Sequence, residues 1–338
     1  MFGQVLDGKN ILITGGTGSF GYACVRELLG KYNPNKVIIL SRDEMKQWKM
    51  ASDFEHYGEK LRFFLGDVRD VERLKMSFRD VDIVIHAAAT KIVHLAEYNP
   101  FECVKTNIWG AMNVVEAALF AGVKNVVALS TDKASSPVNL YGATKLTSDK
   151  IFIAASHSYS GSTNTKFSVV RYGNVMGSRG SVIPFFINYP KDKPLPITDV
   201  GMTRFMITLE EGVDLVFTAI LDMLGGELYV KKIPTMNILD IAKSVREDFA
   251  YEEVGIRPGE KLHEQMIGLE DCNYTYEYDS YYKILPAIYD VYKRPEYIKD
   301  GIKVSDKFEY TSNNKNNIML VEELRKWIED NKHKMLDL

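Results

Sequence analysis

Short apolar runs alternate with segments of helical periodicity along the first half of the chain. Between the runs, apolar residues recur at helical spacing, as at Val25, Leu28 and Leu29. The runs that predict strands lie at residues 10–13, 37–40, 61–65, 81–85, 126–129 and 167–170. We therefore expect an α/β fold with a doubly wound parallel sheet, because parallel neighbours need a crossover connection, usually a helix.

The pattern changes after about Tyr172, where prolines and aromatic residues interrupt the periodicity. We predict one domain over residues 1–171, with part of about 205–230 returning to its sheet. A smaller, loop-rich substrate domain is expected over residues 172–338. A last amphipathic helix is predicted from its apolar positions, which are Val321, Leu324, Trp327 and Ile328.

Composition excludes several classes of protein. The 338 residues carry a formal net charge of −3 without a basic block, so neither nucleic acid nor an anionic membrane is favoured as a partner. The three cysteines, Cys24, Cys103 and Cys272, are too widely spaced for a zinc site or a disulfide framework, and no metal is expected. No signal peptide and no apolar run of ~20 residues is visible, so we expect a cytoplasmic protein.

A glycine-rich turn follows the first predicted strand and opens a helix. Gly15, Gly18 and Gly21 have the spacing of a dinucleotide-binding fingerprint. Such a turn lets the backbone approach a pyrophosphate, and the helix N-terminus offers free amides to the anion. A turn without a ligand is the alternative, which the position after a first strand disfavours. The predicted contacts in this turn are Gly15, Thr17, Gly18, Ser19, Phe20 and Gly21.

The end of the second strand bears on the choice of cofactor. NAD-binding proteins usually place an acidic residue there, whereas this strand ends in Ser41 and Arg42. A guanidinium suits a 2′-phosphate, so we expect NADP, although Asp43 keeps NAD open and Arg42 could be a solvated surface residue. The further residues predicted to contact the cofactor are Ser41, Arg42, Asp43, Glu44, Lys46, Asp67, Val68, Ala87, Ala88, Lys91, Tyr141 and Lys145.

Two pairs of polar residues follow the fifth predicted strand. Tyr141 and Lys145 are four residues apart, so they share one face of a helix. We expect the Lys145 ammonium to lower the pKa of the Tyr141 phenol, which could then take a proton from a substrate hydroxyl as hydride leaves the same carbon. With the glycine-rich turn, this pair resembles the short-chain dehydrogenase/reductase superfamily and its Rossmann domain.

Asp132 and Lys133 directly follow Thr131, where a catalytic hydroxyl is expected. An acid and a base at this point suggest a second reaction after oxidation. Once C4 of a sugar is a ketone, Lys133 could remove the acidified C5 hydrogen while Asp132 protonates the departing C6 hydroxyl. Without the flanking motifs, a surface ion pair would be the simpler interpretation.

The chain is similar over nearly its whole length to inverting UDP-N-acetylglucosamine 4,6-dehydratases, a family of the extended superfamily branch. Retaining dehydratases carry an Asp-Glu pair where this chain has Asp132 and Lys133. The matching segments are residues 14–21, 41–44, 66–70, 96–100, 129–133, 139–145, 171–174, 177–181 and 257–264. The chain departs from the usual Lys-His-Val-Pro after Ala89, since Lys91 is followed by Ile92, Val93 and His94. His94 is then a packed or solvated residue rather than a replacement catalyst.

The resemblance implies a function and a set of residues. It implies a lyase with tightly held, recycled NADP that inverts C5 of UDP-N-acetylglucosamine and begins pseudaminic acid synthesis. The implied catalytic residues are Thr131, Asp132, Lys133, Tyr141 and Lys145. The implied substrate contacts are Lys91, Asn174, Ser178, Arg179, Gly180, Ser181, Val182, Thr198, Arg204, Arg257, Glu260 and Asn314. A homo-oligomer, either a dimer through a helix pair or a hexamer, is also implied.

Three alternatives remain at this point. Another nucleotide-sugar dehydratase, a 4-epimerase or a dehydrogenase of the same superfamily would share the turn, Tyr141 and Lys145. An epimerase or a dehydrogenase has no evident use for Asp132 and Lys133. A non-catalytic NADP-sensing scaffold would need neither pair. Arg204 and Arg257 could each be solvated surface residues rather than partners of a diphosphate.

Overall fold

The computed structural model describes residues 2–159, 161, 164–178, 180–314 and 316–336. Within this part of the chain, the first six strands form a parallel sheet in the order β3-β2-β1-β4-β5-β6. Their bounds are β1 (Asn10–Thr14), β2 (Lys36–Ser41), β3 (Leu61–Leu65), β4 (Ile83–His86), β5 (Asn125–Leu129) and β6 (Lys166–Arg171). This order is that of the Rossmann fold, which confirms the predicted fold class.

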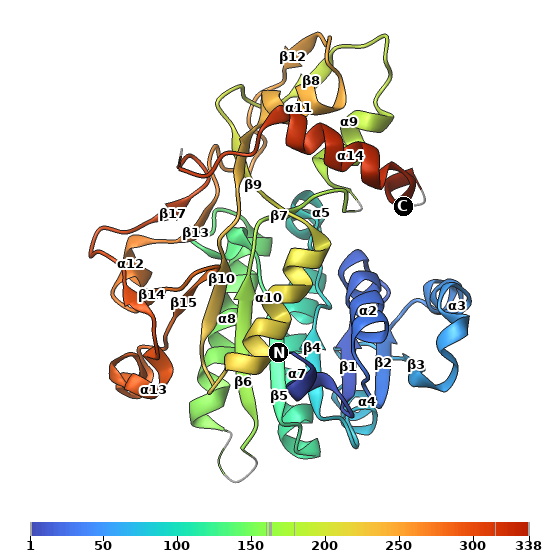
Figure 1. Cartoon of the computed structure of the whole chain (residues 1–338), viewed down its shortest axis with the longest axis vertical. Helices are drawn as coiled ribbons and strands as arrows, with labels where there is room; N and C mark the ends of the chain where they lie inside the picture. Colours follow the sequence, from blue (N-terminus) through green and yellow to red (C-terminus); the bar gives the residue numbers. More distant parts are fainter. Residues whose placement is uncertain (1, 160, 162–163, 179, 315, 337–338) are drawn as a thin grey trace.

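Helices cover both faces of this sheet. α2 packs against α10, which lies in front of the strands in Figure 1, whereas α4, α7 and α8 pack together. The bounds are α2 (Ser19–Lys31), α3 (Glu44–Asp53), α4 (Val71–Ser77), α7 (Gly110–Ala121), α8 (Leu140–Ser158) and α10 (Leu209–Asp222). Shorter helical segments are α1 (Gly3–Leu6), η1 (Glu55–Lys60), α5 (Val93–Tyr98), α6 (Pro100–Val104), η2 (Lys105–Trp109) and η3 (Asp132–Ala134).

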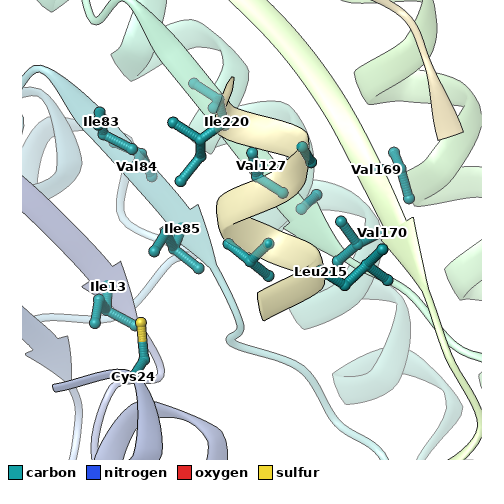
Figure 2. Close-up of a cluster of buried hydrophobic side chains, with 14 of the residues drawn as sticks. Ile13, Cys24, Ile83, Val84, Ile85, Val127, Val169, Val170, Leu215 and Ile220 are labelled. Carbon is teal, nitrogen blue, oxygen red and sulfur yellow. The ribbon is translucent and has the colours of Figure 1, made fainter. Parts of the chain in front are cut away.

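The core lies between the strands and these helices. β4 buries all of its side chains, and β1 and β2 bury all but the first, which explains why these strands appear as continuous apolar runs. Figure 2 shows Leu215 and Ile220 of α10 lying against strand residues such as Val127 and Val170, all of them buried. Burial of each such side chain stabilises the fold by about 1.5–3 kcal/mol.

The second half of the chain returns to the sheet. β10 (Leu228–Lys231) pairs in parallel with β6, and antiparallel strands extend the sheet beyond it. These are β15 (Tyr281–Ile284), β14 (Thr275–Glu277) and β16 (Ile302–Lys303). The flanking helices are α12 (Leu269–Cys272), η5 (Ile288–Lys293) and α13 (Pro295–Ile298). α10 and β10 fall largely within the expected return at 205–230, whereas β14 to β16 form a second return.

The remaining residues build a smaller lobe over one end of the sheet (Figure 1). In its three-stranded sheet, β9 (Thr203–Ile207) lies between β7 (Asn174–Val175) and β11 (Thr235–Asn237). Two further pairs are β8 (Leu195–Ile197) with β12 (Tyr251–Glu253), and β13 (Gln265–Ile267) with β17 (Tyr310–Thr311). A separate core forms where Ile183, Phe186, Ile241 and Leu324 meet. The helices are α9 (Val182–Asn188), α11 (Ile238–Val245) and α14 (Val321–Leu336), the last of which confirms the predicted amphipathic helix.

Candidate active site

The glycine-rich turn joins β1 to α2 and fits a dinucleotide. Gly15 has a φ of +65°, and a Cβ there would lie 2.8 Å from the backbone nitrogen of Ala88. A Cβ on Gly21 would lie 1.9 Å from the Gly16 carbonyl oxygen, so only glycine lets α2 approach the turn. Gly18 caps the helix with no side chain, which leaves the first amides of α2 free for an anion. Thr17 lies in the turn, and Ser19 and Phe20 begin the helix.

The end of β2 brings several predicted cofactor residues to the same edge. Ser41 is buried and accepts a hydrogen bond from Gln47 Nε2 at 3.1 Å. The Arg42 side chain is 61% exposed, and its Nη1 lies 3.6 Å from Asp67 Oδ2. A largely exposed guanidinium remains available to a phosphate. Asp43 instead caps α3 by accepting from the Lys46 backbone amide at 3.0 Å, and Glu44 is the first residue of that helix.

Strand pairing fixes the neighbours of this edge. β1 lies between β2 and β4, so the glycine-rich turn, Arg42 and the Ala87-Ala88 segment follow adjacent strand ends. The Ala87 amide donates to the Thr14 carbonyl oxygen at 3.2 Å, which continues the strand pairing past β4. Asp67 and Val68 follow β3 next to Arg42. A cofactor that crosses this edge would meet all four segments, as dinucleotides do in this fold.

The Asp132-Lys133 pair sits at the end of β5 in the short helix η3. Asp132 is buried, and its Oδ1 lies 3.1 Å from Lys133 Nζ. Thr131 caps this helix, and its hydroxyl donates to the same Oδ1 at 2.8 Å. Burial lowers the pKa of Lys133, but Asp132 and Glu264 outweigh this effect and raise it above its usual value. The ammonium form is therefore the resting form.

Tyr141 and Lys145 lie in the first turns of α8, which Asn139 caps by accepting from the Gly142 amide at 2.7 Å. Both side chains are buried. Burial raises the pKa of Tyr141 to about 12, although Lys133 and Thr131 act in the opposite direction. The expected lowering of this pKa by Lys145 is therefore wrong: desolvation dominates, and Lys133 supplies the opposing charge. Burial also lowers the pKa of Lys145, against the charge of Asp149.

A cavity of about 690 Å³ opens beside Lys133, a size typical of small-molecule sites. Eight of the predicted substrate residues line it: Asn174, Gly180, Ser181, Val182, Thr198, Arg204, Arg257 and Glu260. Lys91, Ser178 and Asn314 are not among the described lining residues, and Arg179 lies outside the described part of the chain.

The lining carries unused hydrogen-bonding capacity. Among the described residues, Asn174 Oδ1, Ser181 Oγ and Glu264 Oε2 are buried without a partner, and so is Oδ2 of Asp132, the ion-pair partner of Lys133. Buried polar atoms in native structures are normally paired, so three unpaired atoms in one cavity lining indicate a site that is completed by a polar ligand. No group of three or more His, Cys, Asp or Glu residues suited to a metal occurs in the described ranges, and no described helix is long and apolar enough to cross a membrane.

Sequence reasoning missed Glu264 and Lys261 as site residues. Glu264 is buried, with Oε1 3.3 Å from Lys133 Nζ, and Lys261 Nζ donates to the Ser135 carbonyl oxygen at 2.6 Å. Both belong to the matching segment 257–264, so the family resemblance is the signal that could have found them. His94, by contrast, is exposed on α5.

Comparisons with known proteins agree with this geometry. The family described as "Polysaccharide biosynthesis protein" matches residues 11–286. A Campylobacter jejuni protein named UDP-N-acetylglucosamine 4,6-dehydratase (inverting) is 53% identical over 92% of this chain and 94% of its own length. The crystal structure of Pen from Bacillus thuringiensis is 35% identical, with a TM-score of 0.88 over 97% of this chain and 98% of that one.

A more distant structure bears on the fold and names a cofactor. DesIV, a dTDP-glucose 4,6-dehydratase from Streptomyces venezuelae solved with NAD, is 24% identical, with a TM-score of 0.66 over 75% of this chain and 86% of its own. Because the C. jejuni relative exceeds half identity across almost the whole chain, the resemblance inferred from the motifs is confirmed. This chain belongs to the polysaccharide biosynthesis protein family, on the branch of the inverting UDP-N-acetylglucosamine 4,6-dehydratases.

Proposed function

We propose that the chain is a UDP-N-acetylglucosamine 4,6-dehydratase that inverts C5 and yields a UDP-2-acetamido-2,6-dideoxy-L-arabino-hexos-4-ulose. The observation that carries the proposal is the Asp132-Lys133 ion pair next to Tyr141, in which Asp132 is buried and Lys133 lines the 690 Å³ cavity. A 4-epimerase or a simple dehydrogenase needs a proton acceptor at C4 but neither an acid nor a base for C5 and C6. Burying the Asp132 carboxylate also has a desolvation cost, and its role in the elimination gives a reason for the pair to persist.

The residues divide the reaction between them. Tyr141 accepts the proton of the C4 hydroxyl while the C4 hydride leaves. Lys133 then takes the C5 proton, and Asp132 gives a proton to the C6 hydroxyl, which departs as water. A proton returns to C5 from the opposite face when hydride adds to C6. A nicotinamide cofactor, when bound, supplies the reversible storage of that one hydride.

The cofactor we propose is NADP. Gly15 and Gly21 form a cradle that a side chain would fill, so the turn suits a nicotinamide dinucleotide. Arg42 favours NADP over NAD because its side chain is 61% exposed and its carboxylate contact, with Asp67, is a long one at 3.6 Å. Lys145 would hold the ribose near Tyr141, since it is buried and forms no ion pair within the described residues.

The diphosphate of the substrate needs cationic partners. Arg257 lines the cavity with a side chain that is 62% exposed and a weak contact of 3.8 Å to Glu260, so it can turn to an anion. Arg204 also lines the cavity, but its Nη1 donates to the Thr203 carbonyl oxygen at 2.7 Å and its Nε faces Glu264. We therefore assign the diphosphate to Arg257 and a role near the sugar to Arg204.

We further propose that the enzyme works in the cytoplasm as a homo-oligomer at the first step of pseudaminic acid or related surface-glycan synthesis. The resemblance supports the pathway and the assembly. Large apolar side chains that are more than half exposed gather on α5 to α7, where a second copy would cover them. These are Tyr98, Phe101, Trp109, Met112 and Phe120.

The test is incubation of the purified protein with UDP-N-acetylglucosamine in deuterated water. We expect a 4-keto-6-deoxy product with one solvent deuterium at C5, inverted C5 configuration and no accumulated NADPH. Net reduction of the cofactor would indicate a dehydrogenase, and a C4 epimer with an intact C6 hydroxyl would indicate an epimerase. Either result would overturn the proposal.

A further inference from the structure

Glu264 reaches the catalytic lysine from a distant part of the chain. It precedes β13, is 2% exposed and lines the cavity. Its Oε1 lies 3.3 Å from Lys133 Nζ, while Asp132 Oδ1 lies 3.1 Å from the same nitrogen. The ammonium therefore sits between two carboxylates, of which only Asp132 has a place in the elimination.

The backbone of Glu264 is held independently of its side chain. Its amide donates to Ser312 Oγ at 2.8 Å, and its carbonyl oxygen accepts from the Ser312 amide at 2.8 Å. Two residues further on, Arg171 Nη1 donates to the Met266 carbonyl oxygen at 2.7 Å. A substitution at Glu264 can thus change the charge beside Lys133 without removing the contacts that place this segment.

The Glu264 carboxylate is only partly satisfied. Arg204 Nε lies 3.8 Å from Oε1, and Oε2 is buried without a partner among the described residues. A buried carboxylate in this condition opposes folding, because its desolvation is not fully compensated. Its presence beside Lys133 therefore points to a role in the reaction rather than in stability.

Charged and titratable groups face Lys133 from four segments. Asp132 lies on its own segment, Glu264 and Lys261 on the segment before β13, Arg204 on β9 and Tyr141 on α8. The two carboxylates raise the pKa of the lysine, and Arg204 lowers it. Lys133 therefore rests as an ammonium, within 3.1 Å of Asp132 and 3.3 Å of Glu264.

Before the elimination, one proton must move from Lys133 to Asp132. Lys133 must be neutral to take the C5 proton, and Asp132 must be protonated to release water. This state holds the same number of protons as the resting pair and differs by one transfer across 3.1 Å. After the elimination, Lys133 is an ammonium and Asp132 a carboxylate again, so the chemistry regenerates the resting pair. The rate should therefore fall at high pH, where Lys133 no longer carries the proton that this transfer needs.

We propose that Glu264 is a positioning residue that holds Lys133 beside Asp132 and, balanced by Arg204, stabilises the ammonium that forms as the C5 proton is taken. This assignment rests on the proposed dehydratase function. It predicts that loss of the Glu264 charge moves the alkaline limb of the rate profile to lower pH, because an ammonium without its second carboxylate gives up its proton more easily.

The test compares Glu264→Gln, Glu264→Asp and the control Glu270→Gln, which makes the same chemical change at an exposed residue of α12. Formation of the 4-keto-6-deoxy product is measured as kcat/KM across pH, with thermal midpoints to monitor folding. We expect the alkaline limb of the kcat/KM profile of Glu264→Gln to lie at a pH about one unit or more below that of the wild type. Glu264→Asp should keep the wild-type limb at a reduced rate, and Glu270→Gln should match the wild type.

The outcomes separate the two proposals. If the wild type forms keto product but Glu264→Gln loses the same factor at every pH, or loses nothing, Glu264 has no influence on the lysine and the assignment fails. If the wild type forms no keto product, the dehydratase function itself fails, and the Glu264 assignment falls with it.

Discussion

Gly142 approaches Lys133 so closely that a Cβ on the glycine would lie 2.2 Å from the lysine carbonyl oxygen. Gly142 directly follows Tyr141 on α8, whereas Lys133 lies on η3. This contact therefore joins the pair proposed for oxidation at C4 to the pair proposed for elimination across C5 and C6. Because Gly142 has no side chain, α8 with Tyr141 can lie this close to η3 with Lys133.

We predict that Gly142→Ala lowers kcat/KM by about 100-fold, because a shift near 1 Å in the reacting groups has effects of this order. The variant should also lose about 1–3 kcal/mol of unfolding free energy through overpacking. Gly30→Ala on α2 is the matched control, since its Cβ would come no closer than 3.9 Å to any neighbour. Steady-state kinetics with urea unfolding check both effects, and a fully active Gly142→Ala would contradict the contact.

Lys133→Ala should slow the elimination by about 10²- to 10⁴-fold through loss of the general base. The hydride step should persist, so that reduced nicotinamide accumulates on the enzyme and is visible by its absorbance. Because Lys133 also lowers the pKa of Tyr141, this residual oxidation should need a higher pH than in the wild type. Lys150→Ala, at an exposed position of α8, serves as control. Wild-type keto product formation by Lys133→Ala would refute the role of the lysine.

Arg42→Ala should weaken NADP binding by about ten- to a hundredfold, the effect of losing one charge-assisted hydrogen bond of about 1.5–3 kcal/mol. NAD binding should change little, because NAD has no 2′-phosphate. Titrations of both cofactors with the wild type, Arg42→Ala and the exposed control Arg62→Ala check this. Equal weakening of NADP and NAD binding would mean that Arg42 does not contact the 2′-phosphate.

The fold could be predicted because buried parallel strands have a continuous apolar sequence. Val126 and Val127 of β5 belong to such a run, and the strand is found where the pattern indicates it. β8 and β12 have three residues each, too few for any periodicity, and Tyr251 to Glu253 of β12 are all exposed. Such short strands form because a neighbouring segment pairs with them, and the spacing of residues in the sequence does not show which segment that is.

Residue spacing groups site residues only where they are close in sequence, whereas distant cavity residues such as Asn174 and Arg257 came from the family resemblance. Asp132 and Lys133 are adjacent, and Tyr141 and Lys145 share a helix face, so spacing alone groups them. Glu264 reaches Lys133 through the pairing of β13 with β17 and the bonds to Ser312, a long-range arrangement without a local pattern. The pKa of Tyr141 was misjudged for a similar reason: it depends on burial, which two residues on one helix face do not reveal.

Arg257→Ala should raise KM for the UDP-sugar by about ten- to a hundredfold with little change in kcat, since it removes a charge-assisted contact that is the same in ground and transition states. The wild-type KM should also rise with salt, and that dependence should be smaller in the variant. Arg79→Ala, exposed and outside the cavity, is the control. A fall in kcat at constant KM would instead assign Arg257 to the chemical step.

The last prediction concerns acid stability and begins with a buried histidine. His86 ends β4, and its Nδ1 lies 2.8 Å from Thr14 Oγ1 on β1. The Ala88 amide donates to the same hydroxyl oxygen at 3.3 Å, so the Thr14 side chain links the ring to the segment after β4. Burial, with a smaller contribution from the charge of Lys145, lowers the pKa of His86 to about 3. The folded chain therefore holds a neutral imidazole at pH values where the unfolded chain, with a pKa near 6.5, binds a proton.

Because the unfolded state binds more protons between these two pKa values, the free energy of unfolding must fall as the pH falls below about 6.5. The loss from this group between pH 7 and pH 5 should be about 2 kcal/mol at 1.36 kcal/mol per pH unit. His86→Asn keeps an acceptor for the Thr14 hydroxyl but does not titrate, so it should be less stable at pH 7 through lost packing and lose about 2 kcal/mol less than the wild type on acidification. Urea unfolding of both proteins at the two pH values gives the difference directly, and equal losses would show that His86 is not the titrating group.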